Sequence, residues 1–328
     1  MTLKEIQEGI TIDPTKIEKI KKLDSIVFDC DGVLIDVSNS YDLAIKKTVD
    51  FILKEMTQVN ESGLVTTKMI EGFKASGGFN DEIDVTYALI LAIVAAKKRN
   101  QPFSEFILQV IENADHSGIK SVEKYMNAIN ADVSDIRKKL SYPGKKFQNP
   151  LSSIFDEIFY GSELYQQLYK RNSEFFHGLG LIENDVVILN KDLVTKLHGR
   201  FGKKIAIVTG RGHLSAKHSL KDLFQEFDLD NSKFLEDEPR EMAKPNPQSL
   251  MSSIKGMSGT TSLYVGDSME DYLMARKADE SGISTIFCGV YGTSNDPKAK
   301  KSLFENNHAD IIVQSIDLIP KTLNLVEA

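Results

Sequence analysis

The amino-acid sequence predicts an α/β protein: a doubly wound parallel sheet with a helical domain inserted into it. Two observations predict this fold. Short apolar runs typical of buried strands occur at 24–29, 204–208, 262–265, 284–288 and 310–313, and helix-like segments separate the later ones. The long stretch from 38 to 185 contains helix after helix. We therefore expect residues 1–37 and 186–328 to form the sheet-containing core and residues 38–185 to form the inserted domain.

The predicted strands follow one another in a βαβ pattern, which is typical of parallel pairing. The first run, SIVF at 25–28, ends at two acids, and the second, KIAIV at 204–208, ends at a Thr-Gly pair. A weaker candidate strand, KFLE at 233–236, lies between the second and third runs. Ligands of such sheets bind at the carboxyl ends of the strands, so polar residues at those ends are the first candidates for a site.

The inserted domain is expected to be helical. Its helix-like segments are 40–56, 81–99, 104–114, 121–130 and 152–170. Asn80 or Asp81 can cap the second segment, and SYPGKKFQNP at 141–150 is a turn-rich break. Because the insertion follows the carboxyl end of the first strand, we expect it to act as a lid over the ligand-binding edge of the sheet.

The composition is that of a soluble globular protein of about two domains. Of its 328 residues, 41% are hydrophobic and 27% charged, and a net charge of −7 argues against nucleic-acid binding. Cys30 and Cys288 are too few for a disulfide framework or a zinc site. The amino terminus lacks the apolar core of a signal peptide, and the longest apolar run, 87–96, is about half of a bilayer span. We expect a cytoplasmic protein with no membrane or nucleic-acid partner.

Asp29 and Asp31 stand at the end of the first predicted strand. Residues two apart in a strand point to the same side, so both carboxylates enter one space. Like charges repel at that distance and burial strengthens the repulsion, so a cation is expected between them, most simply a metal ion with oxygen ligands. The alternative interpretation is a turn, because Asp and Gly commonly follow strands.

Thr209, Gly210 and Lys244 extend the pattern. Thr209 and Gly210 follow the second core strand, where a hydroxyl and a flexible backbone N–H suit an anion; a plain Thr-Gly turn is the alternative. Lys244 precedes a helix for which Asn246 is the expected N-cap and Pro247 the first residue. That start fixes the lysine in an extended approach to the site; a solvated surface lysine is the alternative.

Asp267 and Asp271 follow the third core strand. Ser268 and Asp271 fit a capping box, which by itself would explain Asp271. The capping box does not explain Asp267, which stands at the carboxyl end of a buried strand. An acid pair, a threonine, a lysine and a second acid pair are therefore all expected at strand ends.

Four motifs occur in the order FDCDGV, VTGR, KPNP and GDSMED, and with them the sequence resembles the haloacid dehalogenase superfamily. The resemblance covers about 1–37 and 190–328. It extends to the phosphoglycolate-phosphatase-like branch, whose helical cap follows the first motif. It implies a Rossmann-like core, an enlarged α-helical cap, and a Mg²⁺-dependent phosphatase that acts on a small phosphorylated metabolite through an aspartyl-phosphate.

The resemblance implies a role for each acid. Asp29 is the nucleophile that attacks phosphorus, while Asp31 protonates the leaving oxygen and then takes a proton from water. Mg²⁺ is held by the Asp29 carboxylate, the Asp31 backbone carbonyl and Asp267. Asp271 orients a metal-bound water or Lys244.

The remaining motifs are implied to bind the phosphoryl group. Thr209, the Gly210 N–H and Lys244 hold its oxygens and stabilise charge in the transition state. In relatives that displace halide or cleave phosphonates, the position of Asp31 is not Asp, because no leaving oxygen needs a proton. Asp31 therefore indicates phosphoester chemistry.

Substrate choice is expected to lie in the inserted domain. The segment EGFKASGGFNDE at 71–82 joins two helices, and its glycines allow close approach to a ligand. Lys74 and Asn80 are the candidate contacts there, with Arg211 from the core. The alternative is that the glycines simply end a helix.

Other residues offer no rival site. His213 and His218 are five apart, off the i, i+4 spacing of two metal ligands on one helix face. Cys30 points away from the acids and is expected to be a packed thiol. The apolar helix at 87–96 is expected to form the core of the inserted domain or a contact in a homodimer. Two other functions stay open: a phosphomutase or phosphotransferase with the same nucleophile, and a non-catalytic phosphate-binding protein.

Overall fold

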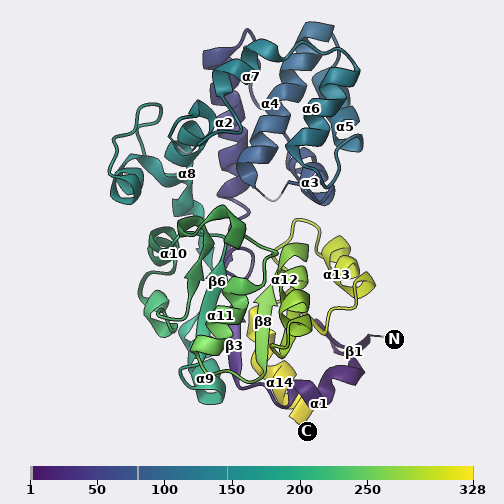
Figure 1. The fold of residues 1–328 in the computed structure, drawn as a ribbon, viewed down its shortest axis with the longest axis vertical. Helices are drawn as coiled ribbons and strands as arrows, with labels where there is room; N and C mark the ends of the chain where they lie inside the picture. Colours follow the sequence, from purple (N-terminus) through teal and green to yellow (C-terminus); the bar gives the residue numbers. More distant parts are fainter. Residues whose placement is uncertain (1–2, 80, 146, 328) are drawn as a thin grey trace. The chain divides into compact units, whose positions relative to one another are not determined.

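The structure is a computed structural model that describes residues 3–79, 81–145 and 147–327 (Figure 1). Two compact units make up the chain: Met1–Ser38 together with Asp185–Ala328, and Asn39–Asn184. Each unit has a hydrophobic core of its own. The catalytic and cap roles that the sequence assigns to these stretches stay predictions.

The first unit contains an eight-stranded, mostly parallel sheet, which confirms the predicted α/β class. In spatial order the strands are β1 (Lys4–Gln7), β2 (Ile10–Ile12), β10 (Ile311–Val313), β9 (Thr285–Val290), β8 (Ser262–Gly266), β3 (Ser25–Phe28), β6 (Ile205–Thr209) and β7 (Lys233–Phe234).

One edge of the sheet is antiparallel, a detail that the sequence does not predict. There β1 pairs antiparallel with β2, and β2 pairs antiparallel with β10. The chain can pair in this direction because the short β1–β2 hairpin adds to the edge without a crossover helix.

The central strand β3 lies between β8 and β6 and is buried along its whole length. Ile26 and Phe28 belong to one core cluster and Val27 to another, as the alternation of side chains in a strand requires. The helices that cover the sheet are α1 (Ile17–Ile20), α9 (Lys191–Phe201), α10 (His213–Leu220), α11 (Gln248–Gly256), α12 (Met269–Glu280), α13 (Pro297–Asn306) and α14 (Ile319–Glu327). Burial on both faces explains why the central strands are continuously apolar in sequence.

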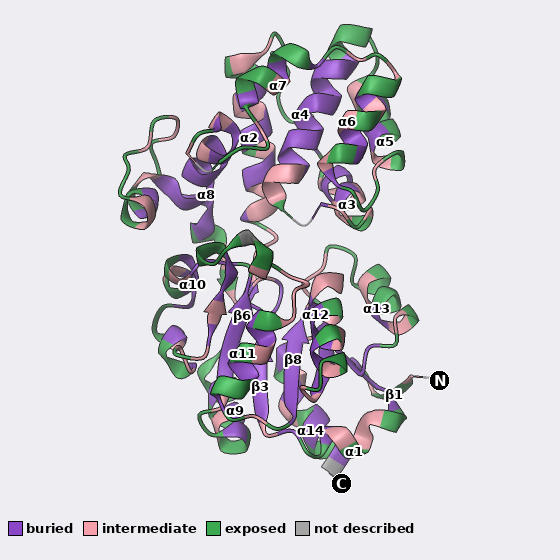
Figure 2. Cartoon of the chain, in the orientation of Figure 1, coloured by how far each residue is buried: buried purple, intermediate pink, exposed green. Residues whose placement is uncertain are grey.

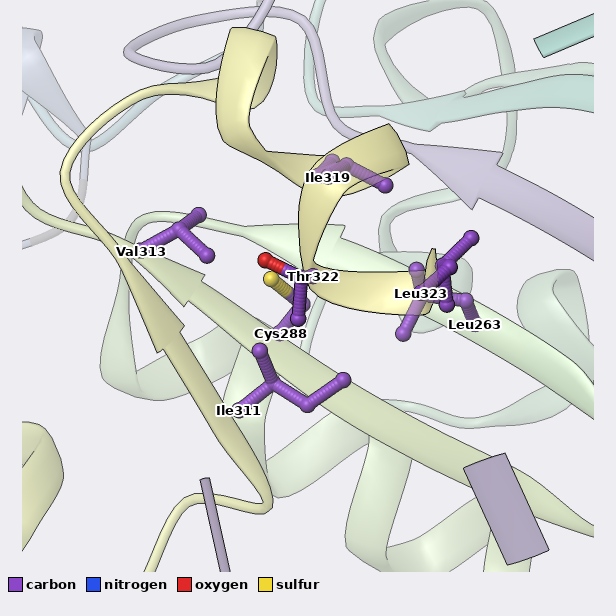
Figure 3. Close-up of a pocket in the computed structure, with 7 residues that line it drawn as sticks. All are labelled: Leu263, Cys288, Ile311, Val313, Ile319, Thr322 and Leu323. Atoms are coloured by element: carbon purple, nitrogen blue, oxygen red, sulfur yellow. The ribbon is translucent and has the colours of Figure 1, made fainter. Parts of the chain in front are cut away.

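A small recess lies between α14 and strands β8, β9 and β10 (Figure 3). Apolar side chains line it, including Leu263 and Ile319, together with the Cys288 thiol and the Thr322 hydroxyl. It has no carboxylate and no basic group, so it offers nothing that would hold a phosphate or a metal ion.

The second unit is helical. Its helices are α2 (Tyr41–Met56), α3 (Thr67–Ala75), α4 (Glu82–Arg99), α5 (Phe103–Glu112), α6 (Ile119–Ala128), α7 (Ser134–Leu140) and α8 (Pro150–Tyr169). In α4 every residue from Val85 to Ala96 is buried in the core of this unit (Figure 2). The apolar stretch at 87–96 is therefore internal core and presents no face to a second copy.

Helix α8 contains a break that the sequence does not predict. Gly161 has φ +73°, and a Cβ there would lie 2.2 Å from the Gly180 nitrogen. Near this break the buried Glu157 carboxylate accepts hydrogen bonds from the backbone N–H groups of Glu174, Phe175 and Phe176. One carboxylate thus holds the backbone of the segment after α8.

Among the described residues, none of the helices is both long and apolar enough to cross a bilayer.

Candidate active site

The loop after β3 presents the first two acids. Asp29 is buried, and its backbone N–H donates to the Val265 carbonyl at 2.8 Å, which keeps the pairing with β8 beyond the end of the strand. The chain then turns sharply, because the N–H groups of Val33, Leu34 and Ile35 all donate to the Cys30 carbonyl. Cys30 is fully buried among apolar side chains, as predicted.

Gly32 lies where this loop meets the loop after β8. Its φ is +74°, and a Cβ built on it would lie 2.3 Å from Asp267 Oδ2. The Thr293 hydroxyl, in the segment after β9, donates to the Gly32 carbonyl at 2.6 Å. Glycine is needed here for two reasons, the left-handed backbone and the close approach of the Asp267 carboxylate.

Three carboxylates gather at this edge of the sheet. Asp29, Asp267 and Asp271 have oxygens within 4.8 Å of one another. They converge because Phe28 of β3 pairs with Val265 of β8, so the two strands end side by side. Carboxylate oxygens in such a group suit Mg²⁺, which prefers hard oxygen ligands.

Asp271 is held by neighbours on several sides. The Ser268 hydroxyl donates to Oδ2 at 2.7 Å and the buried Tyr264 hydroxyl to Oδ1 at 2.8 Å. Ser268 and Asp271 form the capping box of α12 that the sequence indicates. Asp271 Oδ1 also lies 2.7 Å from Lys244 Nζ, so Asp271 caps the helix and pairs with the lysine at once.

Lys244 links two of the acids. Its Nζ lies 2.7 Å from Asp29 Oδ1 and 2.7 Å from Asp271 Oδ1, and its side chain is 9% exposed. Burial alone would lower the pKa of Lys244, but the adjacent Asp271 and Asp29 carboxylates outweigh it and hold the pKa well above its usual value. The lysine is therefore a charged, buried group and not a solvated surface side chain.

The expected start of the following helix is wrong by one position. Pro247 is the N-cap of α11, and the helix begins at Gln248. Asn246 still contributes, because its side-chain oxygen accepts from the Gln248 N–H at 3.0 Å. Proline has no N–H for a helix to use, so it fits this half-helical position.

Burial and crowding act on the nucleophile candidate. Burial raises the pKa of Asp29, the Lys244 charge opposes this, and the Asp271, Asp31 and Asp267 carboxylates add to the rise, so that the net pKa is about 8. A bound cation would reverse this balance by stabilising the ionised carboxylate. The residues present therefore fit a divalent metal ion.

Asp267 has a cationic partner of its own. Lys300, on α13, places Nζ 2.6 Å from Asp267 Oδ2. This contact ties the side chain after β8 to the helix after β9.

The phosphate-binding candidates lie on the other side of β3. Thr209 is the buried last residue of β6, the strand that flanks β3 opposite β8. Gly210 follows it and is exposed. The Thr209 hydroxyl accepts from the Arg211 N–H at 3.2 Å, which begins a tight turn before α10.

Arg211 is not on the surface. Its side chain is 0% exposed, and Nη2 lies 2.7 Å from Asp31 Oδ1. Nη1 lies 2.8 Å from Asp185 Oδ2 and donates to the Ser219 hydroxyl at 2.7 Å. The structure thus brings Arg211 to Asp31, and the predicted substrate contact of Arg211 stays a prediction.

Of the specificity residues predicted in the inserted unit, Lys74 has a contact within that unit. Lys74 lies in the last turn of α3, and its Nζ is 3.2 Å from Glu82 Oε1. Asn80 lies outside the described residues. Asp81 caps α4 through the Ile83 N–H at 2.8 Å. A role of Lys74 and Asn80 in substrate choice stays a prediction.

Sequence reasoning missed several residues that surround the acids: Tyr264, Thr293, Lys300, Asp185 and Ser219. None of them belongs to a local motif. Tyr264 looks like one more apolar residue of a buried strand, and the others reach the site from segments distant in sequence. Only the fold brings them there.

Comparison with known proteins identifies the class. A profile of the haloacid dehalogenase-like hydrolases matches residues 23–279, so the chain belongs to this family and is a hydrolase by class. The match spans the β3 acids, the whole inserted unit and the acids after β8.

Solved structures share the fold. A phosphatase, Tt82, from Thermococcus thioreducens is 23% identical, with a TM-score of 0.56 over 85% of this chain and 98% of that one. A structural-genomics target, 19% identical, has a TM-score of 0.65 over 93% of this chain and 100% of its own.

One curated sequence also matches. A protein named imidazoleglycerol-phosphate dehydratase, from Phytophthora nicotianae, is 28% identical over 157 residues. The match covers 43% of this chain and only 33% of that protein, so it says nothing of the reaction here.

Proposed function

We propose that this hydrolase is a Mg²⁺-dependent phosphatase that cleaves a small-molecule phosphate monoester through an aspartyl-phosphate on Asp29. The observation that carries the proposal is the buried Asp29 carboxylate, with Lys244 Nζ at 2.7 Å and with Asp267 and Asp271 beside it. Such a group has a nucleophile, a fixed positive charge and oxygen ligands for a metal ion in one place.

The proposed reaction has two steps. An Asp29 oxygen attacks phosphorus, the phosphorus–oxygen bond to the alcohol breaks, and Asp31 gives the leaving oxygen its proton. Water then attacks the phosphorus of the aspartyl-phosphate and loses a proton to Asp31, which releases phosphate and restores Asp29. Lys244 and Thr209 bind the phosphoryl oxygens, and the Gly210 N–H adds a donor.

Asp29, the Asp31 backbone carbonyl and Asp267 are the proposed metal ligands, and Asp271 supports Lys244. When bound, Mg²⁺ supplies positive charge that offsets the crowded carboxylates and the phosphoryl group. The chain's own residues keep Asp29 aligned, since Lys244 binds Asp29 and Asp271 together.

The proposed substrate is a small phosphorylated metabolite, and the proposed setting is the cytoplasm. The direct test is to screen a panel of phosphomonoesters for phosphate release with Mg²⁺, with chelator, and with Asp29→Asn. We expect release that needs both the metal and Asp29, because an amide of nearly the same shape is a poor nucleophile.

Two results would reject parts of the proposal. Phosphate release by folded Asp29→Asn protein at the wild-type rate would exclude the covalent route. Transfer of phosphate to a second substrate hydroxyl without release of inorganic phosphate would make the enzyme a transferase or mutase.

A further inference from the structure

We propose that Arg211 is a positioning residue for Asp31, and that Asp185 and Ser219 in turn hold Arg211. The inference rests on the proposed function, because it assigns the geometry of the proton-transfer group in that reaction. The buried network of Arg211, Asp185 and Ser219 would then serve to orient the Asp31 carboxyl at the active site.

The network joins three segments of the first unit. Arg211 Nη2 lies 2.7 Å from Asp31 Oδ1, after β3, and Nη1 lies 2.8 Å from Asp185 Oδ2, just before β5 (Val186–Val187). The Ser219 hydroxyl on α10 accepts from Arg211 Nη1 and donates to Asp185 Oδ2, each at 2.7 Å. A guanidinium can serve several partners in this way because it is a planar fork of donors.

Burial makes these contacts costly to break. The Arg211 side chain is 0% exposed and that of Asp185 3% exposed, whereas that of Asp31 is 26% exposed. A buried charge is tolerated only when its partners are in place, so Asp185 and Ser219 fix the guanidinium from the protein side. Asp31 is the partner that faces outward, where a substrate would arrive.

Asp31 needs such a partner because its task depends on orientation. Its carboxyl must meet the leaving oxygen in the first step and water in the second. An unrestrained Asp side chain rotates among rotamers, and a misplacement of about 1 Å can cost roughly 100-fold in rate. Arg211 limits this rotation through its contact with Asp31 Oδ1.

The same turn also carries the phosphate-binding hydroxyl. The Arg211 N–H donates to Thr209 Oγ1 at 3.2 Å. This hydrogen bond links Thr209, the proposed ligand of a phosphoryl oxygen, to Arg211, which positions Asp31. Arg211 acts through Asp31, which distinguishes this role from the direct substrate contact that the sequence suggests.

The test uses Arg211→Gln, Arg211→Lys and Ser219→Ala, with Asp31→Asn as reference and p-nitrophenyl phosphate and an alkyl phosphate as substrates. The first step with p-nitrophenyl phosphate breaks the ester bond and releases p-nitrophenolate, which needs no proton. The second step still needs a base for water. Loss of Asp31 positioning should therefore slow release of phosphate more than formation of the phosphoenzyme.

For Arg211→Gln with p-nitrophenyl phosphate we expect kcat to fall by about 10–100-fold, KM to fall with it, and phosphoenzyme to accumulate in the steady state, as in Asp31→Asn, because the second step becomes rate-limiting. The alkyl phosphate should lose more than p-nitrophenyl phosphate, because its leaving group needs the acid. Ser219→Ala should show the same pattern more weakly. Arg211→Lys, which keeps the charge but not the fork, should fall between Arg211→Gln and wild type.

The decisive comparison is the double variant. If Arg211 acts only through Asp31, Asp31→Asn with Arg211→Gln is no slower than Asp31→Asn alone. A further loss of tenfold or more, or a rise in KM without phosphoenzyme accumulation, overturns the inference and indicates direct contact with substrate.

The matched control is Arg276→Gln. Arg276, on α12, also pairs with a buried acid, Asp310, which directly precedes β10, and its loss should lower thermal stability without changing phosphoenzyme accumulation. The same accumulation in Arg276→Gln would overturn the inference, since loss of any arginine that pairs with a buried acid would then produce it. A wild-type protein without phosphatase activity would refute the proposed function, whereas an active wild type with unaltered Arg211→Gln kinetics refutes only this inference.

Discussion

Gly32→Ala should damage the active site far more than the fold. The new Cβ would start 2.3 Å from Asp267 Oδ2 and 2.5 Å from its Cγ, while ordinary contacts begin near 3.4 Å, so the carboxylate must retreat by about 1 Å. The backbone at φ +74° adds roughly 1–2 kcal/mol of strain for a residue with a Cβ.

The movement of Asp267 sets the expected size of the effect. Asp267 is a proposed metal ligand and also binds Lys300, so a shift of about 1 Å predicts a loss of roughly 100-fold in kcat/KM, or about 2.7 kcal/mol of transition-state stabilisation. Mg²⁺ affinity, measured by calorimetry, should fall as well.

Gly282→Ala is the matched control for strain. Gly282 has φ +86°, and a Cβ there meets nothing within 4 Å. The control should lose a similar amount of stability with unchanged kcat/KM and Mg²⁺ affinity. If Gly32→Ala instead keeps its activity and Mg²⁺ affinity within a few-fold of wild type, the close approach of Gly32 to Asp267 is not needed for activity or metal binding, and this prediction is wrong.

Three further changes have defined outcomes. Lys300→Met should weaken Mg²⁺ binding by about 10-fold, because Lys300 orients Asp267 and the loss of a residue that holds a metal ligand typically lowers metal affinity by at least this factor. Tighter Mg²⁺ binding by calorimetry would show instead that the lysine competes with the metal. Asp24→Asn should lower the free energy of unfolding by about 1–2 kcal/mol at pH 7, because it weakens the hydrogen bonds that the Asp24 carboxylate accepts. Burial raises the pKa of Asp24, but hydrogen bonds from the Thr260 and Thr261 N–H groups and from Lys204 outweigh burial and lower the pKa overall. Because the pKa of Asp24 is lower in the folded than in the unfolded protein, its stabilising contribution is present above pH 3.8 and is lost as the pH falls further. In urea titrations, the difference in unfolding free energy between wild type and Asp24→Asn should therefore shrink below about pH 4. A difference that stays constant down to pH 2 would refute the assignment. Glu157→Gln should cost roughly 1.5–3 kcal/mol of unfolding free energy by losing charge-assisted bonds to three backbone N–H groups, whereas the exposed Glu163→Gln on the same helix should cost almost nothing.

The sequence predicts the parts of this molecule whose signals are local. Strands β3, β6, β8, β9 and β10 are predicted because each is a short apolar run that ends at a turn, and burial on both faces of the sheet requires such runs. The acids after β3 and β8 stand out for the same reason, since charged residues directly after an apolar run need an explanation.

The parts that could not be predicted depend on long-range pairing. Strand β1 is polar and mostly exposed, and β2 has only three residues, so nothing local distinguishes the pairing of β1 with β2 or of β2 with β10. Gly161 sits in a helix-like pattern, and only the contact with Gly180 explains its break. Arg211 follows a predicted anion-binding turn and resembles a ligand contact until its burial against Asp31 and Asp185 is seen.

The proposed mechanism requires Asp29 to carry a phosphoryl group during turnover. The most direct measurement mixes the enzyme with a phosphomonoester substrate and Mg²⁺, quenches in acid, and identifies the modified peptide by mass spectrometry, with Asp31→Asn used to slow hydrolysis of the intermediate. We expect one phosphoryl group on Asp29, lost in alkali and absent from Asp29→Asn. Turnover in which Asp29 never carries phosphate, or in which another residue carries it, would rule out the covalent mechanism on Asp29.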